Sequence, residues 1–134
     1  DKKDYIIEKN NKNLFKNDNY SIEEIAIKDM TIDLDMKTSE VVKIFENNKE
    51  LQSIVVTDND KVAGLIMRDK LYFKLGSKYG YSVYMDRPIK LIMDKAPLIV
   101  KAKTPISEVS DLAMNREISK IYDCIVVRKK EMIF

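Results

Sequence analysis

Histidine and tryptophan are absent from this sequence of 134 residues, and cysteine occurs once. Histidine is the commonest acid–base catalyst and metal ligand, so its absence removes the usual centre for either chemistry. The single thiol, Cys124, precedes the apolar run 125–127 and has no imidazole to activate it, which indicates a buried structural residue rather than a nucleophile. The sequence shows no convergent acid–base pair or metal cluster. We therefore predict no catalytic and no metal-binding residues, and an enzyme is the least favoured class.

Long apolar runs and blocks of one charge are also missing. No segment approaches membrane-spanning length and no signal-peptide pattern is present, so we expect a cytoplasmic location without membrane insertion. The 24 basic and 22 acidic residues are intermixed, and no basic cluster alternates with aromatic residues in the manner of single-strand binders. We therefore predict that nucleic acid is not a partner. The length suits one compact domain or two small halves packed together.

The most informative stretch contains two apolar runs, 53–58 and 62–66, joined by Asn59-Asp60-Lys61. Asn and Asp tolerate positive φ and hydrogen-bond their own backbone, so this pattern predicts a β-hairpin. The runs are continuous rather than alternating, which predicts strands buried on both faces. Gly64, inside the second run, predicts a close backbone approach by another chain segment or by a ligand.

A helix over residues 68–75, ended by Gly76, is predicted to follow the hairpin. A buried strand that leads into a helix N-terminus is a common site for a small anionic ligand. It is equally a common way of packing a core, so the stretch predicts a fold more firmly than a chemistry.

The two halves of the chain repeat. Residues 37–38 recur as 103–104, and the run 54–56 recurs as 125–127, at offsets of about 66 to 71 positions. Each half reads as strand, helix and hairpin, with Thr38 and Thr104-Pro105 as expected helix starts. Ser21 and Glu24 match a capping box for an earlier short helix. The prediction is an α/β fold of two β-α-β-β-α repeats packed as a pseudo-symmetric pair.

In this order and repetition the sequence resembles a tandem pair of cystathionine-β-synthase-type (CBS) domains, also called a Bateman module. The resemblance implies a linker or N-terminal helix over 1–20, a first repeat over 21–76, an inter-repeat linker over 77–87 and a second repeat over 88–134. Ile133-Phe134 match Val62-Ala63, so the second repeat is expected to be C-terminally truncated and the chain to be a fragment of a longer protein.

The segments 74–85 and 87–95 resemble the corresponding part of CBS pairs in bacterial cyclic-di-GMP signalling proteins, where they accompany EAL and GGDEF domains. The resemblance implies a regulatory, non-catalytic module that forms a homodimer and is covalently attached to EAL or GGDEF domains.

Members of the family bind adenine nucleotides such as AMP, ADP or ATP in clefts between the paired halves. Many hold the ribose with a pattern that begins at a glycine, continues to a serine or threonine and ends three residues later at Asp or Asn. Here Met67 stands in place of the hydroxyl residue and Lys70 in place of the carboxylate, with Asp69 one position early. Successive helical residues differ by about 100°, so Asp69 is expected to point elsewhere. The candidate ligand-binding residues are Met67, Arg68, Asp69 and Lys70, and their departures from the pattern predict weak adenine-nucleotide binding.

Three functions remain open at this point. The chain is a regulatory module that senses an adenine or guanine nucleotide, a structural dimerising element without a ligand, or, least favoured, an enzyme. The tyrosines at 72, 79, 81 and 84 suit either stacking on an adenine or anchoring of the linker and a dimer interface.

Overall fold

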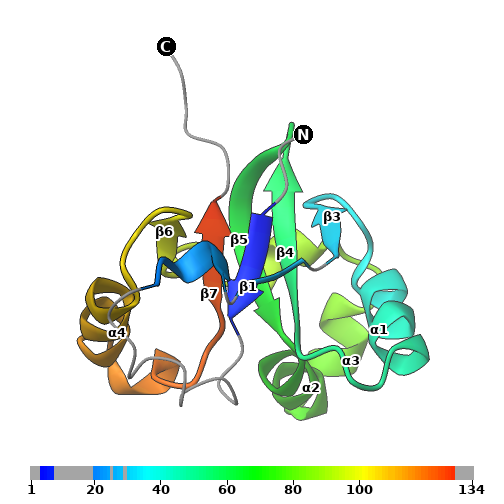
Figure 1. Ribbon diagram of the computed structural model, residues 1–134. Coiled ribbons are helices and arrows are strands. Elements are labelled where there is room, and N and C mark those ends of the chain that lie inside the picture. The colour runs from blue at the N-terminus through cyan, green and yellow to red at the C-terminus, as the bar shows by residue number, and fades with distance from the viewer. Residues whose placement is uncertain (1–3, 8–19, 25, 29, 129–134) are drawn as a thin grey trace. The chain divides into compact units, whose positions relative to one another are not determined.

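The computed structural model describes residues 4–7, 20–24, 26–28 and 30–128, and it has an α/β architecture with two β-sheets (Figure 1). The chain divides into two compact units. Residues 30–96 form the contiguous unit. The described parts of 1–29 and 97–134 form the discontinuous unit, whose two segments are separated in the sequence by the contiguous unit.

The strands are β1 (Asp4–Ile7), β2 (Ile27–Lys28), β3 (Thr31–Asp33), β4 (Ser53–Asp58), β5 (Lys61–Met67), β6 (Ile99–Lys101) and β7 (Ile125–Arg128). The α-helices are α1 (Thr38–Asn47), α2 (Arg68–Gly76), α3 (Gly80–Tyr84) and α4 (Ile106–Met114). Three 3-10 turns complete the described structure: η2 (Ile22–Glu24), η3 (Ile89–Leu91) and η4 (Ile118–Lys120).

The sheet of the contiguous unit has the order β3-β4-β5, with β3 parallel and β5 antiparallel to β4. The predicted hairpin is confirmed, because β4 and β5 are joined by Asn59 (φ 49°) and Asp60 (φ 68°). Two consecutive positive φ values match the right-handed twist of the flanking strands, which explains the Asn-Asp pair. Residues 54–56 of β4 are fully buried, as a strand covered on both faces requires.

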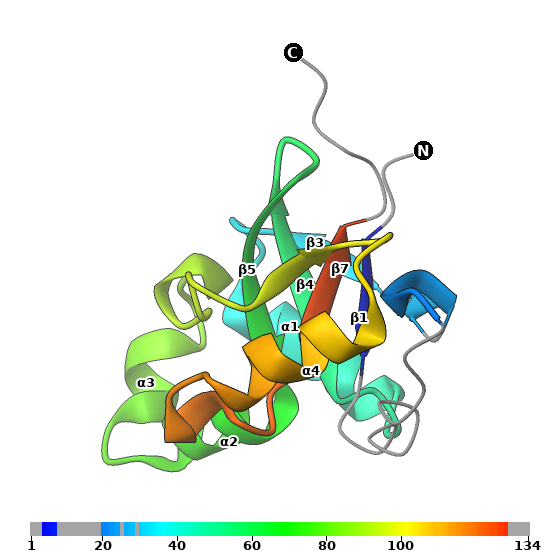
Figure 2. The same ribbon diagram turned by 60° about the vertical axis from the view of Figure 1, so that its left-hand side comes forward.

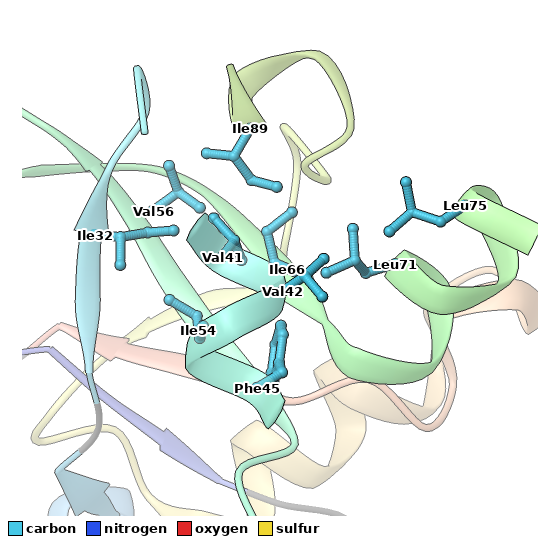
Figure 3. Packing of buried hydrophobic residues seen from close by; sticks show 10 residues of the cluster. All are labelled: Ile32, Val41, Val42, Phe45, Ile54, Val56, Ile66, Leu71, Leu75 and Ile89. Atoms are coloured by element: carbon cyan, nitrogen blue, oxygen red, sulfur yellow. The ribbon is translucent and has the colours of Figure 1, made fainter. Parts of the chain in front are cut away.

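The core of the contiguous unit lies between this sheet and helices α1 and α2 (Figure 3). In α1 the apolar residues recur at helical spacing, so that Val41, Val42 and Phe45 are buried on one side. In α2 the pair Leu71 and Leu75, four positions apart, does the same. Each fully buried side chain of this size contributes roughly 1.5–3 kcal/mol of transfer free energy. The ten buried members are Ile32, Val41, Val42, Phe45, Ile54, Val56, Ile66, Leu71, Leu75 and Ile89.

The close approach predicted at Gly64 is made by a chain segment. Leu65 and Asp94 exchange two backbone hydrogen bonds, of 3.0 and 2.9 Å, so the segment at Asp94 lies along the free edge of β5. A Cβ atom on Gly64 would lie 2.7 Å from the carbonyl oxygen of Asp94 and 2.7 Å from the sulfur of Met93. Only glycine allows this segment to pair with β5.

The sheet of the discontinuous unit has the order β2-β1-β7-β6, with β6 parallel and β1 antiparallel to β7. Strand β1 therefore takes the position beside β7 that β5 takes beside β4. The sequence interpretation of residues 1–20 as a linker or helix is wrong for Asp4–Ile7, which form this strand. The run Asp4-Tyr5-Ile6-Ile7 is too short to predict a strand whose partner is more than 100 positions away. Residues 8–19 lie outside the described residues, as does the strand expected at 131–134.

The opening segment of each repeat packs in the unit formed by the rest of the other repeat. Ile22 is fully buried in a cluster with Val100 and Ile106, and its backbone N–H donates to the Thr104 carbonyl oxygen at 2.8 Å. In the same way Ile89 is fully buried in the contiguous unit, where its N–H donates to the Met36 carbonyl oxygen at 2.7 Å. The boundaries of the compact units therefore differ from those of the predicted repeats 21–76 and 88–134, and the limits of the repeats remain a prediction from the sequence.

The expected capping box at Ser21 and Glu24 is present, since the Ser21 N–H donates to the Glu24 carboxylate at 2.8 Å. The expected caps at Thr38 and Thr104 are wrong. Helix α1 begins at Thr38 itself, after Lys37, and α4 begins at Ile106, after Pro105, and neither has a side-chain cap. The equivalent helix starts are thus 68 positions apart, not about 66. The Thr38 hydroxyl instead donates to the Arg87 carbonyl oxygen at 2.9 Å.

Candidate functional site

The four predicted ligand-binding residues lie together where β5 runs into α2, in the contiguous unit. Met67 ends the strand in an extended conformation (φ −93°, ψ 133°), and α2 begins at Arg68 without a side-chain cap. Met67 and Arg68 are half-buried, whereas Asp69 and Lys70 are exposed. The strand-to-helix geometry expected at an anion site is therefore present.

Arg68 is engaged in holding the unit together. Its Nε donates to the Leu51 carbonyl oxygen at 2.7 Å, and one Nη donates to the carbonyl oxygens of Phe45 and Asn48 at 2.8 and 2.5 Å. The guanidinium also lies 4.9 Å from the centre of the Phe45 ring. The Phe45 and Asn48 carbonyls stand at the C-terminus of α1, where the helix dipole favours a cation, and the Leu51 carbonyl belongs to the segment that follows. The structure thus assigns this side chain a structural role, and it offers a ligand little of its hydrogen-bonding capacity.

The N-terminus of α2 has two of its first amide groups already bonded. The Arg68 N–H donates to the Gln52 carbonyl oxygen at 2.8 Å, and the Lys70 N–H donates to Asp69 Oδ1 at 2.8 Å. The Asp69 carboxylate thus lies against the amides of the first helical turn, where it offsets the positive end of the helix dipole. Lys70 supplies a cation on the same turn. The junction thus combines one exposed cation, Lys70, with a carboxylate that already occupies part of the helix N-terminus.

A second arginine, Arg116, which the sequence analysis did not identify, bonds backbone carbonyl oxygens in the same way in the discontinuous unit. Arg116 Nε donates to the Ala113 carbonyl oxygen at 3.1 Å, and one Nη donates to those of Ile121 and Asp123 at 3.0 and 3.2 Å. Burial lowers the pKa of Arg116, while the charges of Asp123 and Cys124 act in the opposite direction.

Ala113 in α4 is 68 positions from Phe45 in α1, so both arginines bond the equivalent carbonyl. The signal for Arg116 in the sequence was a basic residue just past a helix end.

The tyrosines divide into two pairs. Tyr72 packs near Phe45, with ring centres 6.5 Å apart, and Tyr84 is half-buried beneath the Lys74 ammonium, which lies 5.5 Å from its ring centre. Tyr79 and Tyr81 are exposed, at 68% and 65% of their full area. The first pair anchors helices α2 and α3 to the core, and the second pair remains accessible to a partner or ligand.

The contiguous unit has the order β3-α1-β4-β5-α2, with a parallel first pair of strands and a following hairpin. Residues 22–76 match the CBS domain. The match confirms the resemblance for the first predicted repeat, and it supports a regulatory and non-catalytic module, because CBS domains are of this kind. No curated protein matches the chain. Within the described residues, no helix combines the length and apolarity needed to cross a membrane.

Several solved structures share the fold, among them CBS proteins. A CBS domain-containing protein from Thermotoga maritima is 19% identical, with a TM-score of 0.56 over 72% of this chain and 74% of that one. The CBS domain pair of protein MJ0100, in complex with 5′-methylthioadenosine and S-adenosyl-L-methionine, is 18% identical with a TM-score of 0.55, covering 71% and 74%. The cytosolic domain of the Mg²⁺ channel MgtE, in complex with ATP, is 16% identical with a TM-score of 0.51, covering 63% and 33%.

Proposed function

We propose that this chain is a non-catalytic regulatory module of a larger cytoplasmic signalling protein, and that it binds a phosphorylated adenine or guanine nucleotide at the β5–α2 junction. The CBS match over 22–76 supports a regulatory role. Two solved structures that share the fold carry adenine-containing ligands, one of them ATP. The observation that carries the choice of ligand is Lys70, an exposed cation on the first turn of α2.

The energetics favour phosphate over ribose as the recognised group. Where a family pattern has a carboxylate, this chain has a lysine, so the two charge-assisted bonds to a ribose diol are not made. Each such bond is worth roughly 1.5–3 kcal/mol net, and each 1.4 kcal/mol is about tenfold in affinity. A nucleoside should therefore bind at least one to two decades more weakly than in a site with the carboxylate. A polyphosphate regains part of this through Lys70, in a salt-sensitive manner.

The test is titration calorimetry with adenosine, AMP, ATP and GTP on the wild type and on Lys70→Asp. We expect affinity to rise with the number of phosphates in the wild type, and we expect Lys70→Asp to reverse that order in favour of adenosine. Lys43→Asp, at an exposed position of α1, is the matched control for the change of charge. Tight adenosine binding by the wild type that Lys70→Asp leaves unchanged would place ribose recognition elsewhere and contradict the proposal.

The attached output domains are proposed to be of the EAL or GGDEF type, so that the module regulates cyclic-di-GMP turnover. The support for this is the resemblance of segments 74–85 and 87–95. The test is the complete reading frame, followed by assay of cyclic-di-GMP synthesis and hydrolysis with and without nucleotide. A frame without either domain would rule out this context, while the nucleotide proposal would stand or fall separately.

A second candidate function is that of a structural dimerising element without a ligand. It is favoured by the exposure of Phe73, which stands in the middle of α2 with 82% of its area accessible, and by the exposure of Tyr79 and Tyr81. Large exposed apolar groups that gather on one surface are typical of interaction sites. Dimers in sedimentation at tens of micromolar, without heat in any nucleotide titration, would favour this function over the first.

A further inference from the structure

One edge of β7 is occupied by a strand that is more than 100 positions away in the sequence. Residues 4–7 of β1 pair antiparallel with residues 125–128 of β7, so that Asp4 lies opposite Arg128. Figure 2 shows the two strands side by side, β1 in blue and β7 in red. In the contiguous unit the equivalent edge of β4 is taken by β5, which follows β4 after the two-residue turn Asn59-Asp60. A distant strand therefore stands where the next segment of the chain stands in the other unit.

The segment that directly follows β7 has the same order of residue types as β1. Residues 4–7 read Asp-Tyr-Ile-Ile, and residues 131–134 read Glu-Met-Ile-Phe, so each is a carboxylate followed by three large, mainly apolar residues. Only Lys129-Lys130 separates β7 from the second of these segments. Tyr, Ile and Phe favour strand conformation, so both segments are suited to pair with the edge of a strand.

A two-residue turn at 129–130 would give the second segment the register that β1 has. Such a turn joins β4 to β5. After β7 it would place Glu131 opposite Arg128, and the last pair would be Phe134 with Ile125. Arg128 and Ile125 are also the first and last partners of β1, and the other edge of β7 is already paired with β6. The two segments would therefore need the same four positions of β7, and only one of them can be paired at a time.

The two registers are equivalent in what they set opposite β7. Ile125 and Val127 belong to the buried cluster of the discontinuous unit, and a large, mainly apolar residue stands opposite each of them in either register. An acidic residue stands opposite Arg128 in either register, and opposite charges in a cross-strand pair are favourable. A shift by a single residue would have reversed the faces of the whole segment. The agreement in both residue type and phase marks the two segments as alternative partners of β7.

Each segment has an advantage that the other lacks. Strand β1 is also paired on its far side, through two residue pairs with β2. Residues 131–134 need only a two-residue turn to reach β7, so little chain entropy is lost in closing it. Lys129-Lys130 opposes that turn, because lysine lacks the tolerance for positive φ that Asn59 and Asp60 provide between β4 and β5. These terms act in opposite directions.

We propose that β1 and residues 131–134 exchange on the edge of β7, and that this exchange is a two-state switch built into the discontinuous unit. Because the two pairings are close in free energy, a small bias on either segment shifts the population between them. Release of β1 also releases β2, whose neighbour in the sheet is β1. A change at 131–134 is thus transmitted to residues 4–7 and 27–28. The inference goes beyond the nucleotide-binding function, because the exchange requires no ligand and lies in the other compact unit.

The test is amide hydrogen exchange, followed by mass spectrometry, on variants that favour or block the second pairing. Lys129→Asn combined with Lys130→Gly supplies the residues preferred in two-residue hairpin turns. We expect amide exchange in residues 4–7 to accelerate about tenfold, equivalent to about 1.4 kcal/mol in the balance of the two pairings. Residues 131–134 should become protected in the same variant.

Ile133→Pro blocks the second pairing. In a two-residue hairpin the residues that flank the turn, and every second residue from them, donate to the partner strand, and proline at 133 removes one of these donors. Added to the Asn-Gly variant, Ile133→Pro should abolish the acceleration at 4–7. In the otherwise unaltered chain it removes the competing segment, so exchange at 4–7 should slow by about twofold or more. Ile133→Val keeps a strand-forming residue and is the matched control, with exchange as in the wild type.

Three outcomes would overturn the proposal. Protection of 131–134 in the Asn-Gly variant without faster exchange at 4–7 would show that the segments do not share one edge of β7. No change at either segment in that variant would show that the second pairing does not form. Equal exchange at 4–7 in the wild type and in Ile133→Pro would show that the unaltered chain does not switch. Exchange in residues 53–67, which form the hairpin of the contiguous unit, reports whether each variant is folded.

Discussion

Replacing Arg68 by alanine tests whether the first arginine of α2 supports the fold or serves a ligand. The substitution removes three hydrogen bonds to carbonyl oxygens, at 2.5–2.8 Å, and the contact with the Phe45 ring. Bonds from a charged donor are worth roughly 1.5–3 kcal/mol each. The side chain is only half-buried, so water can reach the released carbonyls and the contributions do not add in full. We expect a loss of about 2–3 kcal/mol.

The assay is thermal unfolding by circular dichroism, combined with amide hydrogen exchange in α1. At roughly 4 °C per kcal/mol for a chain of this size, the melting temperature should fall by about 8–12 °C. Exchange should accelerate most around residues 45–51, whose carbonyls lose their partner. Arg68→Lys, which keeps the charge but loses the planar fork, should recover less than half of the loss. Lys70→Ala is the exposed control and should change stability by less than about 0.5 kcal/mol.

A ligand-binding Arg68 would give a different result. Arg68→Ala would then leave the melting temperature of the free protein within about 2 °C of the wild type and would lower only the affinity for a nucleotide. That outcome would refute the structural role derived from the carbonyl bonds. A loss of stability confined to the discontinuous unit would refute it equally, because the three hydrogen bonds and the ring contact described for Arg68 join it to residues of the contiguous unit.

Three further predictions concern other contacts. Gly64→Ala should destabilise the protein by about 1–3 kcal/mol in denaturant titration, because the new methyl lies 2.7 Å from a backbone oxygen. Gly76→Ala, with open space around it, should be neutral or stabilising by about 0.4–1 kcal/mol. Equal effects of the two substitutions would contradict the packing described at Gly64. Arg116→Ala should accelerate amide exchange in α4 while α1 stays protected, and the reverse pattern would contradict the assignment. Ile89→Ala should lower the free energy of unfolding by about 2–5 kcal/mol and accelerate amide exchange in residues 30–96. Leu91→Ala, at a half-exposed site, should have a small effect. Faster exchange in residues 97–128 instead would show that Ile89 supports the discontinuous unit.

The parts of the fold that could be predicted are those fixed by local pattern. The hairpin followed from Asn59-Asp60 between apolar runs, the close approach from Gly64, and the buried stripe of α1 from its helical spacing. Helix α1 begins one position earlier and α4 one position later than predicted, because threonine is a favourable cap, yet here the extended residue before each helix is Lys37 or Pro105.

Non-local pairing could not be predicted in the same way. Nothing in Asp4–Ile7 indicates that its partner is Ile125–Arg128, and nothing around Ile22 or Ile89 indicates which repeat will bury it. The four candidate site residues lie together at the β5–α2 junction, and their role in binding stays a prediction. The backbone bonds of Arg68 could not be predicted, because they join residues 17 to 23 positions apart that only tertiary packing brings together.

The opening segment of each predicted repeat is buried in the unit formed by the rest of the other repeat, and this arrangement has a consequence for synthesis on the ribosome. Residues 30–96 contain every buried member of their own core, including Ile89, so this unit can fold as soon as it has emerged. Ile22 emerges earlier, yet its burial depends on Val100, Ile106 and Val127, which are made last. Ile22 therefore stays unburied until residues 97–127 have been made. Synthesis that stops after residue 96 would leave a folded contiguous unit and an unburied Ile22.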